Sequence, residues 1–564
     1  MSSVYGSLCI VLHGHLPYVL HHGSYPHGEA WLYEAAAETY LPLLDMIGEA
    51  ALHKARPAIT LGITPVLLEQ LAHPRFKAGF VAYLQDRIER ARADRAEFES
   101  RKELHFAYLA QRWEQWYTRW LQRFEEIDRD IPTQFGQRFR EGHIQILTSN
   151  ATHAYMPLLL NDQAVWAQMA AGVATSKRLL GIQPRGMWLP ECAYRPTWNH
   201  WVPPVLYDNP RSRVGLERFI ADAGVTHFFV DTHLIAQGQP LGIVEKGEFR
   251  GVSEAQLHWD HRRAWRSPLE GVGVASEPTL PRVFAFARHP QISEQVWSGW
   301  IGYPGAGQYL EFHKKYNDRG LRYWKITDNK SDLGAKDPYY PDDVPGKIFE
   351  HAQHFCNLVR DTLRDHYQRT GRQGVVVAPF DAELFGHWWF EGPQFLRDVI
   401  LNLSHNVPEV KLRTAEEALY HHPPDKVMRL PEGSWGEKGD HRVWFNDRVR
   451  WMWEIDYRAE NKLLKLLWEL PWRTQEPVKA MLQRAARQLL LLQASDWPFV
   501  IYSHGAVDYG IERFAEHATQ FDRAADWAIA LAAGKTLTAL EELELRYMDA
   551  HDSIFPEIDL NWWM

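Results

Sequence analysis

The chain has 564 residues, of which 45% are apolar and 24% charged, a balance that excludes a wholly disordered protein. Lys and Arg number 62 against 71 Asp and Glu, so the net charge is −9, which argues against a nucleic-acid partner. The three cysteines, Cys9, Cys192 and Cys356, are scattered, so we expect no disulfide framework. The sequence shows no signal-peptide pattern and no long apolar run, so we expect a cytoplasmic protein without a membrane partner.

Seven short apolar runs predict buried parallel strands. They span residues 7–12, 57–62, 143–147, 186–189, 226–230, 282–287 and 374–378. Segments with helical periodicity, such as 163–180 and 345–369, lie between most of them. Repeated strand–helix–strand units predict an α/β fold with a parallel sheet, and seven units favour a (β/α)7 barrel over an open sheet.

Two insertions and a helical C-terminal part complete the predicted organisation. Residues 76–131, between the second and third strands, predict a helical hairpin, whereas 233–281 predicts a long functional or mobile loop. Helical periodicity returns over 450–468, 477–493 and 511–533. We therefore predict a barrel domain (1–72 and 143–410), an inserted helical domain (73–142) and a C-terminal helical domain (411–564).

Polar and ionisable residues follow the predicted strands. They are His13 and His15, His153, Glu191, Asp231 and His233, Arg288 and His289, and Asp381, Glu383 and His387. In a β/α barrel the carboxyl ends of the strands form the face on which active sites are built. We therefore expect a functional site at this face.

Two carboxylates at this face point to glycosidic chemistry. Glu191 lies in the sequence Trp-Leu-Pro-Glu-Cys-Ala-Tyr, and Asp381 opens Asp-Ala-Glu-Leu-Phe-Gly-His-Trp-Trp. Cleavage of a glycosidic bond needs one carboxylate as nucleophile and another as acid/base, and apolar surroundings raise the pKa of the acid. The alternatives are a salt-bridged rim residue for Glu191 and a helix cap for Asp381.

Histidines and tryptophans add candidate binding residues. His13 and His15 are candidates for sugar contact, for a metal site completed by Asp231, His233 or His153, or for a structural role. The 25 Trp suit stacking on sugar rings, and Trp435, Trp444 and Trp497 lie in turn-rich segments, where packing between domains is the alternative. The sequence has no HExxH, G-x-S-x-G or phosphate-loop pattern, so we expect no metal and no cofactor.

Together these motifs resemble glycoside hydrolase family 57. The resemblance rests on residues 13–18, 147–157, 188–194, 378–392 and, more weakly, 413–418, and it continues through 287–298, 302–305, 433–436 and 495–497. It covers nearly the whole chain. It implies a (β/α)7 barrel with an inserted helical domain and a C-terminal helical domain, and a retaining mechanism without a metal.

The resemblance also assigns residues. It implies Glu191 as the nucleophile and Asp381 as the acid/base of a 1,4-α-glucan branching enzyme, which moves an α-1,4-glucan chain to a 6-hydroxyl. The predicted substrate-binding residues are His13, His15, His153, Arg288, Trp297, Gly305, Trp435, Trp444 and Asp496.

One departure from the family concerns the loop after the fifth strand. Branching enzymes of the family often carry a tyrosine there that favours transfer over hydrolysis, but residues 233–281 contain none and offer Phe249, Trp259 and Trp265 instead. An α-glucan hydrolase or a 4-α-glucanotransferase on the same site is therefore the alternative. A metal-dependent hydrolase or deacetylase using His13, His15 and Asp231, and a non-catalytic glucan-binding protein, are further alternatives. We expect a monomer.

Overall fold

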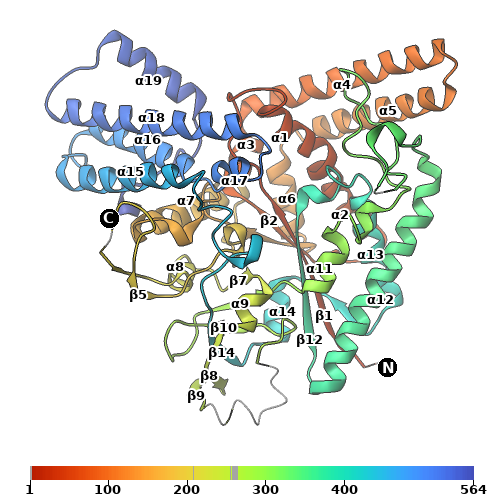
Figure 1. The fold of residues 1–564 in the computed structure, drawn as a ribbon, viewed down its shortest axis with the longest axis horizontal. Helices are drawn as coiled ribbons and strands as arrows, with labels where there is room; N and C mark the ends of the chain where they lie inside the picture. The colour runs from red at the N-terminus through yellow and green to blue at the C-terminus, as the bar shows by residue number, and fades with distance from the viewer. Residues whose placement is uncertain (1–2, 208, 254–255, 257–264, 329) are drawn as a thin grey trace.

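The computed structural model describes residues 3–207, 209–253, 256, 265–328 and 330–564. Seven parallel strands pair side by side in the order β12-β1-β2-β3-β4-β7-β11 (Figure 1). Their bounds are Gly6–Gly14 (β1), Ile59–Ile63 (β2), Ile144–Thr148 (β3), Gly186–Met187 (β4), His227–Val230 (β7), Val283–Ala287 (β11) and Gly374–Asp381 (β12). Each coincides with one of the seven predicted runs.

The two ends of this ladder meet, which closes the barrel. The backbone N–H of His289, just after β11, donates to the carbonyl oxygen of Val377 in β12 at 2.9 Å. Apart from β12 and β1, which are the last and first of the seven, neighbouring strands of this ladder follow one another in the chain among the seven, and each connection contains at least one helix. The predicted α/β fold, a (β/α)7 barrel, is therefore confirmed.

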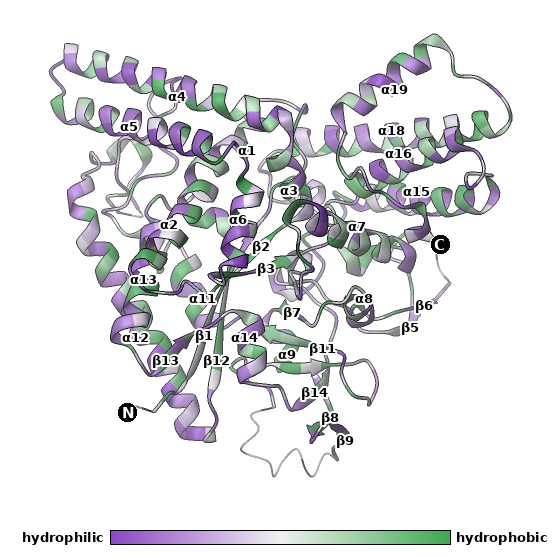
Figure 2. Cartoon of the chain, turned by 180° about the vertical axis from the view of Figure 1, so that it is seen from behind, coloured by the Kyte–Doolittle hydropathy of each residue, from purple (hydrophilic) through white to green (hydrophobic). Residues whose placement is uncertain are grey.

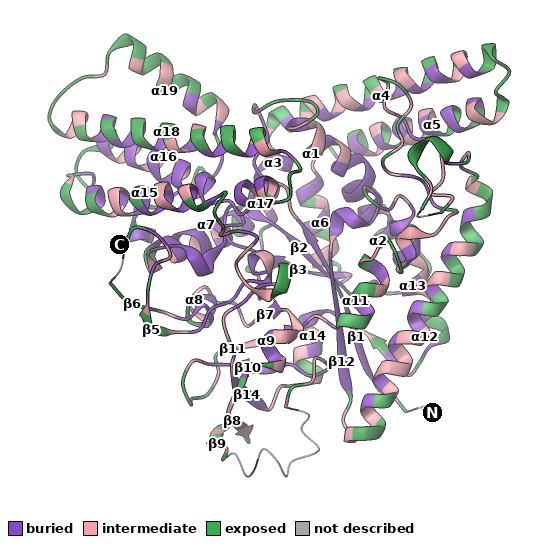
Figure 3. Cartoon of the chain, in the orientation of Figure 1, coloured by how far each residue is buried: buried purple, intermediate pink, exposed green. Residues whose placement is uncertain are grey.

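Helices surround the strands and bury one stripe each. They are α1 (Glu29–Ala35), α2 (Leu41–Leu52), α3 (Pro65–Ala72), α6 (Ile131–Arg140), α7 (Asp162–Leu180), α8 (Leu216–Asp222), α9 (Thr232–Ala236), α11 (Pro290–Trp297), α12 (Val344–Thr370), α13 (Gly392–Asn406) and α14 (Ala415–His421). In α12 the buried Ile348, Ala352, Phe355, Val359 and Leu363 recur at helical spacing, so this helix lays one apolar face on the barrel. Figure 3 shows the result as buried strands and exposed outer helix faces.

The segment between β2 and β3 forms a long helical hairpin, as predicted. Its helices α4 (Pro74–Ser100) and α5 (Leu104–Glu126) pack along their length and project from the barrel (Figure 1). Phe80 of α4 meets Phe124 of α5 edge to face, with ring centres 4.9 Å apart. Polar residues colour much of both helices in Figure 2, as expected for a pair exposed on its outer side.

Five helices form the C-terminal part, which includes the three predicted ones. They are α15 (Arg450–Glu469), α16 (Glu476–Leu492), α17 (Asp496–Tyr502), α18 (Val507–Ala532) and α19 (Ala539–His551). Two strands beyond residue 409, β13 (Val410–Leu412) and β14 (Lys426–Arg429), still belong to the barrel's sheet, where β13 pairs with β1. We therefore propose a C-terminal domain that begins after β14 rather than at residue 411, and retain the other domain bounds as a proposal.

The long insertion after β7 extends the sheet at its edge. Strands β8 (Gln239–Glu245), β9 (Glu248–Gly251) and β10 (Val272–Val274) join it through β14 and β11, and a small separate hairpin pairs β5 (Trp198–Trp201) with β6 (Arg211–Arg213). Among the helices of the described residues, none is both long and apolar enough to cross a membrane.

Candidate active site

Alternation along the strands explains which side chains enter the site. The barrel interior holds Cys9, Val11, Phe229, Phe286, Val375 and Val377. Because side chains alternate between the two faces of a strand, His13, Asp231, Arg288 and Asp381 continue the inward face at the carboxyl ends of their strands. His13 and Asp381 are also register partners on the adjacent strands β1 and β12.

Glu191 follows β4 in a strained turn. The backbone φ of Glu191 is 61° and that of Cys192 is 48°. This is the left-handed region, which residues other than glycine seldom adopt. The Trp435 backbone N–H donates to the carbonyl oxygen of Glu191 at 3.0 Å, and Tyr194 and Gly433 exchange two backbone hydrogen bonds beside it. The segment around Trp435 thus holds the Glu191 turn in place.

Two donors hold the Glu191 carboxyl. Trp435 Nε1 donates to Oε2 at 2.8 Å and Ser495 Oγ donates to Oε1 at 3.1 Å. Burial raises the pKa of Glu191 to about 7, although both hydrogen bonds act in the opposite direction because they favour the ionised form. The carboxyl is thus poised to ionise near neutral pH.

Asp381 has different surroundings. Burial raises the pKa of Asp381 well above its ordinary value, and the charges of Glu383 and Glu191 raise it further, while Arg288 opposes them. Asp381 stands at the N-cap of the short helix Ala382–Leu384, yet among the described residues it makes no capping hydrogen bond, so the helix-cap alternative is not supported. A neutral carboxylic acid beside a carboxylate is the arrangement that acid-assisted cleavage needs.

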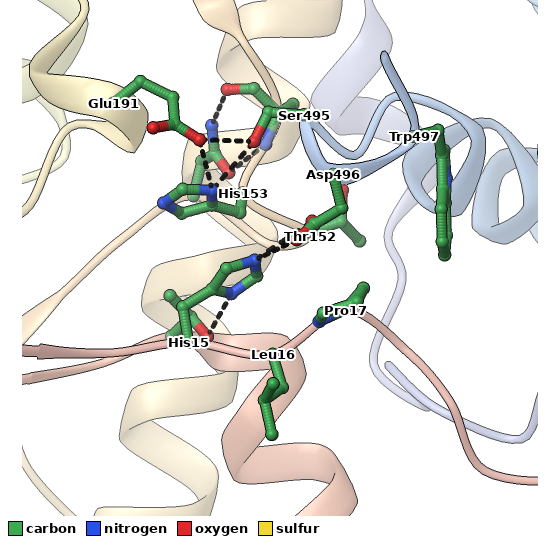
Figure 4. A network of polar contacts seen from close by, with 12 residues as sticks. His15, Leu16, Pro17, Thr152, His153, Glu191, Ser495, Asp496 and Trp497 are labelled. Carbon is green, nitrogen blue, oxygen red and sulfur yellow. Dashed lines mark hydrogen bonds and ion pairs between the residues drawn. The ribbon is translucent and has the colours of Figure 1, made fainter. Parts of the chain in front are cut away.

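Three histidines, His13, His15 and His153, form a layer beside Glu191, and Figure 4 shows His15 and His153 of this layer. His15 stacks on His153 with ring centres 3.9 Å apart, and its Nε2 lies 3.0 and 3.1 Å from the two carboxylate oxygens of Asp496. His13 Nε2 lies 3.0 Å from His153 Nε2, and the His13 ring stacks on Trp188 at 4.8 Å. The layer joins β1, the loop after β3 and the start of α17.

The charge states within this layer differ. Burial lowers the pKa of His15, but the charge and hydrogen bond of Asp496, with Glu383 and Glu191, raise it above its ordinary value overall. Burial, then the neighbouring histidines, lower the pKa of His13 and of His153 well below the ordinary value. His13 and His153 are therefore neutral at neutral pH.

Among the described residues, the predicted metal ligands His13, His15 and Asp231 do not come together. Asp231 is held by Arg288, whose Nη2 lies 2.6 Å from Oδ2, so Asp231 does not join His13 and His15. Among the described residues His15, His153 and Asp496 do offer ligand atoms within 4.8 Å of one another. However, the two rings lie nearly parallel, at 19°, and both nitrogens of each ring already face a protein partner.

The predicted aromatic contacts divide into two groups. Trp435 is half-buried against Glu191, and Trp297, at the end of α11, is 44% exposed and lies edge to face with Trp388. Trp444 is 1% exposed and stacks on Tyr155 at 4.5 Å. The Trp444 ring therefore lies in the core of this structure, and its predicted substrate contact stays a prediction.

The other predicted residues have local roles that leave substrate contact a prediction. A Cβ at Gly305 would lie 2.1 Å from the carbonyl oxygen of Gly299, which explains the glycine there. Sequence reasoning missed Ser495, Thr64 and the exposed Trp388. Ser495 and Trp388 lie inside the quoted motifs 495–497 and 378–392, so the motifs contained them but gave neither a role.

The β8–β9 hairpin is one described part of the loop without tyrosine. This hairpin, which includes Phe249 in β9, lies at the lower edge of Figure 1, well away from α17. Trp259 falls outside the described residues.

Comparison with known proteins agrees with this arrangement. Residues 9–431 match the family model "Glycosyl hydrolase family 57", and residues 456–563 match "1,4-alpha-glucan branching enzyme, C-terminal". The 1,4-alpha-glucan branching enzyme TK1436 of Thermococcus kodakarensis is 36% identical over 96% of this chain and 77% of its own length.

Two solved structures are also similar. The GH57-type branching enzyme of Pyrococcus horikoshii has a TM-score of 0.88 and 34% identity over 99% of this chain and 97% of its own. The alpha-amylase AmyC of Thermotoga maritima has a TM-score of 0.80 and 29% identity over 99% of both chains. This chain therefore belongs to glycosyl hydrolase family 57.

Proposed function

We propose that this protein is a 1,4-α-glucan branching enzyme. The observation that carries the proposal is the pair of partly buried carboxyls, Glu191 held by two hydrogen-bond donors and Asp381 with the negative charges of Glu383 and Glu191 nearby. One of those donors, Ser495, comes from the segment that matches the branching-enzyme C-terminal model. The named relatives support the same activity.

The reaction follows from the two roles. Glu191 attacks the anomeric carbon of an α-1,4-glucan while Asp381 gives its proton to the leaving 4-oxygen, which forms a glucosyl ester on Glu191. The Asp381 carboxylate then takes the proton of an acceptor 6-hydroxyl, whose oxygen attacks the same carbon and releases Glu191. Two inversions retain the α configuration and create an α-1,6 branch.

The remaining assignments are proposals of the same kind. We propose that Arg288, Trp297, Gly305, Trp435, Asp496 and His15 bind the glucan. His13, His153 and Trp444 are at most 3% exposed, so their predicted contact with substrate stays a prediction. The three free, buried cysteines suit a reducing cytoplasm, and we propose that the protein works there as a monomer.

A hydrolase, or a 4-α-glucanotransferase, is the second candidate. Residues 233–281 lack the tyrosine associated with transfer, and the similar AmyC is named an alpha-amylase. If water replaces the acceptor in the second step, the same two carboxyls hydrolyse the glucan.

Linkage analysis of amylose treated with the purified protein separates the candidates. New α-1,6 linkages and new reducing ends are counted in one sample. A branching enzyme gives many α-1,6 linkages with few excess reducing ends. Reducing ends without α-1,6 linkages would contradict branching and support hydrolysis, and new α-1,4 chain lengths alone would support the glucanotransferase.

Variants at the two carboxyls test the site. We expect Glu191→Gln and Asp381→Asn each to lower the rate at least about 1,000-fold, because each removes one step of the double displacement. Glu469→Gln, on the exposed end of α15, is the matched control. Full activity in either site variant would show that the chemistry lies elsewhere.

A further inference from the structure

A chain of three hydrogen bonds links Ser495, just before helix α17 of the C-terminal part, with Glu191, His153 and His13, and Figure 4 shows Glu191, His153 and Ser495 close together. Ser495 Oγ lies 3.1 Å from Glu191 Oε1 and 2.9 Å from His153 Nδ1. His153 Nε2 in turn lies 3.0 Å from His13 Nε2. Ser495, His153 and His13 are at most 3% exposed, so water is largely excluded from the contacts among these three residues. The Glu191 side chain is 15% exposed.

Donor and acceptor chemistry gives this chain one direction. An ionised Glu191 can only accept, so the single hydroxyl proton of Ser495 goes to Oε1. Ser495 Oγ then accepts from Nδ1–H of His153, which leaves His153 Nε2 to accept from Nε2–H of His13. The last atom, His13 Nδ1, is then an unprotonated nitrogen, and it is buried with no hydrogen-bond partner among the described residues.

The tautomers in this chain are assigned from its contacts and are mutually consistent. Both histidines must be neutral for the chain to hold, and burial lowers the pKa of each well below the ordinary value. The unpaired atom at the far end is then an acceptor rather than an N–H, and orphaned buried N–H groups are the rarer of the two in proteins.

Ser495 is free for this role because it does not cap its helix. Serine at an N-cap normally accepts a hydrogen bond from the second or third helical N–H. Ser495 stands at the N-cap of α17 in helical conformation, and no side-chain capping bond is made there in the described structure. Its hydroxyl is hydrogen-bonded to Glu191 and His153 instead.

We propose that Ser495 is a positioning residue for the nucleophile, and that His153 and His13 fix the direction in which its hydroxyl donates. The proposal rests on the role of Glu191 proposed above. With Trp435 on Oε2 and Ser495 on Oε1, both oxygens are fixed, so the carboxylate plane is set before the sugar arrives. The C-terminal domain thereby completes the nucleophile of the barrel.

Electrostatics agree with this geometry. Burial raises the pKa of Glu191 to about 7, and the hydrogen bonds from Trp435 and Ser495 both oppose that rise. Removal of the Ser495 hydroxyl therefore leaves a nucleophile that is harder to ionise as well as less well oriented.

The test compares Ser495→Ala, Ser495→Thr and Ser503→Ala. Ser503→Ala is the matched control, because Ser503 is exposed at the other end of α17. For Ser495→Ala we expect kcat on amylose to fall about 10- to 100-fold with KM within about twofold, and the acidic limb of the pH profile to move up by about one pH unit. Ser495→Thr, which keeps the hydroxyl, should restore the wild-type limb.

A second measurement follows the ionisation of the Glu191 carboxyl and needs no activity assay. Infrared difference titration, with the Glu191→Gln spectrum subtracted, reports the ionisation of this carboxyl in the wild type and in Ser495→Ala. A higher midpoint in Ser495→Ala supports the inference even if the wild type fails to branch amylose, which would overturn only the proposed function. An equal midpoint, an unchanged acidic limb, or a Ser495→Thr profile like that of Ser495→Ala would overturn the inference.

Discussion

Single residues decide how the two carboxyls differ. Two hydrogen-bond donors reach Glu191, whereas among the described residues none is recorded for the side chain of Asp381. Hydrogen bonds to the ionised form favour a carboxylate, and nearby negative charge favours a neutral acid. The proposed nucleophile and acid/base are both carboxyl groups, so their different tendencies to ionise come from the groups around them.

The cost of ionising Glu191 gives a prediction for stability. The pKa of Glu191 is about 7 in the folded protein against an ordinary 4.5. Below pH 4.5 both states are protonated and no penalty exists; as pH rises to 7 the unfolded state ionises first, so the folded state loses up to on the order of 3 kcal/mol. Gln never ionises, so the stability of Glu191→Gln relative to the wild type should rise between pH 5 and pH 8.

Urea unfolding at those two pH values measures this difference. Glu469→Gln is the control, because Glu469 is exposed at the end of α15 and should show no such change. A difference between Glu191→Gln and the wild type that stays constant with pH would contradict a raised pKa at Glu191.

At the scale of secondary-structure elements, helices pack through buried rows of apolar side chains that recur at helical spacing. In the hairpin of α4 and α5, Phe76 and Phe80 stack one turn apart with ring centres at 5.4 Å, and Phe124 meets both. Trp113 Nε1 donates to the carbonyl oxygen of Arg322 at 2.7 Å, which ties the hairpin to the segment before α12. The hairpin is thus a packed part of the protein, held by aromatic rings.

Phe80→Ala tests that buried row. Phe80 is fully buried, so truncation should destabilise the protein by about 3–5 kcal/mol through lost apolar contact and the cavity left behind. Phe349→Ala is the matched control, since Phe349 on α12 is 58% exposed and should cost under about 1 kcal/mol. Thermal unfolding of both variants gives the comparison; equal shifts in Tm would show that the buried row contributes little.

At the scale of the whole molecule, buried polar contacts dock the C-terminal helices on the barrel. Glu460 of α15 accepts from the backbone N–H groups of Leu160 and Asn161 at 2.9 and 2.8 Å, just before α7. Gln168 of α7 donates to Gln493 at 3.1 Å, and His15 meets Asp496. These contacts place Ser495 over the barrel, so docking and catalysis are linked.

Removal of the Glu460 carboxylate tests the docking. Glu460→Ala leaves two buried N–H groups without their acceptor, which should cost about 2–4 kcal/mol in urea unfolding. Glu469→Ala, nine positions along the same helix, removes only an exposed ion pair with Lys465 and should cost about 0.5 kcal/mol or less. Equal losses in the two variants would show that Glu460 does not hold the interface.

The sequence by itself determined the barrel, the helical hairpin, the main C-terminal helices and the face that carries Glu191 and Asp381. Those features repeat every two or 3.6 residues along the chain, and parallel strands bring their carboxyl ends to one face whatever the loops do. Only the tertiary structure decided that Trp444 is sealed in the core, that β13 and β14 belong to the barrel's sheet, and that Ser495 touches Glu191. Ser495 lies 304 positions from Glu191, and a contact at that separation depends on how two packed units dock, which no local pattern records.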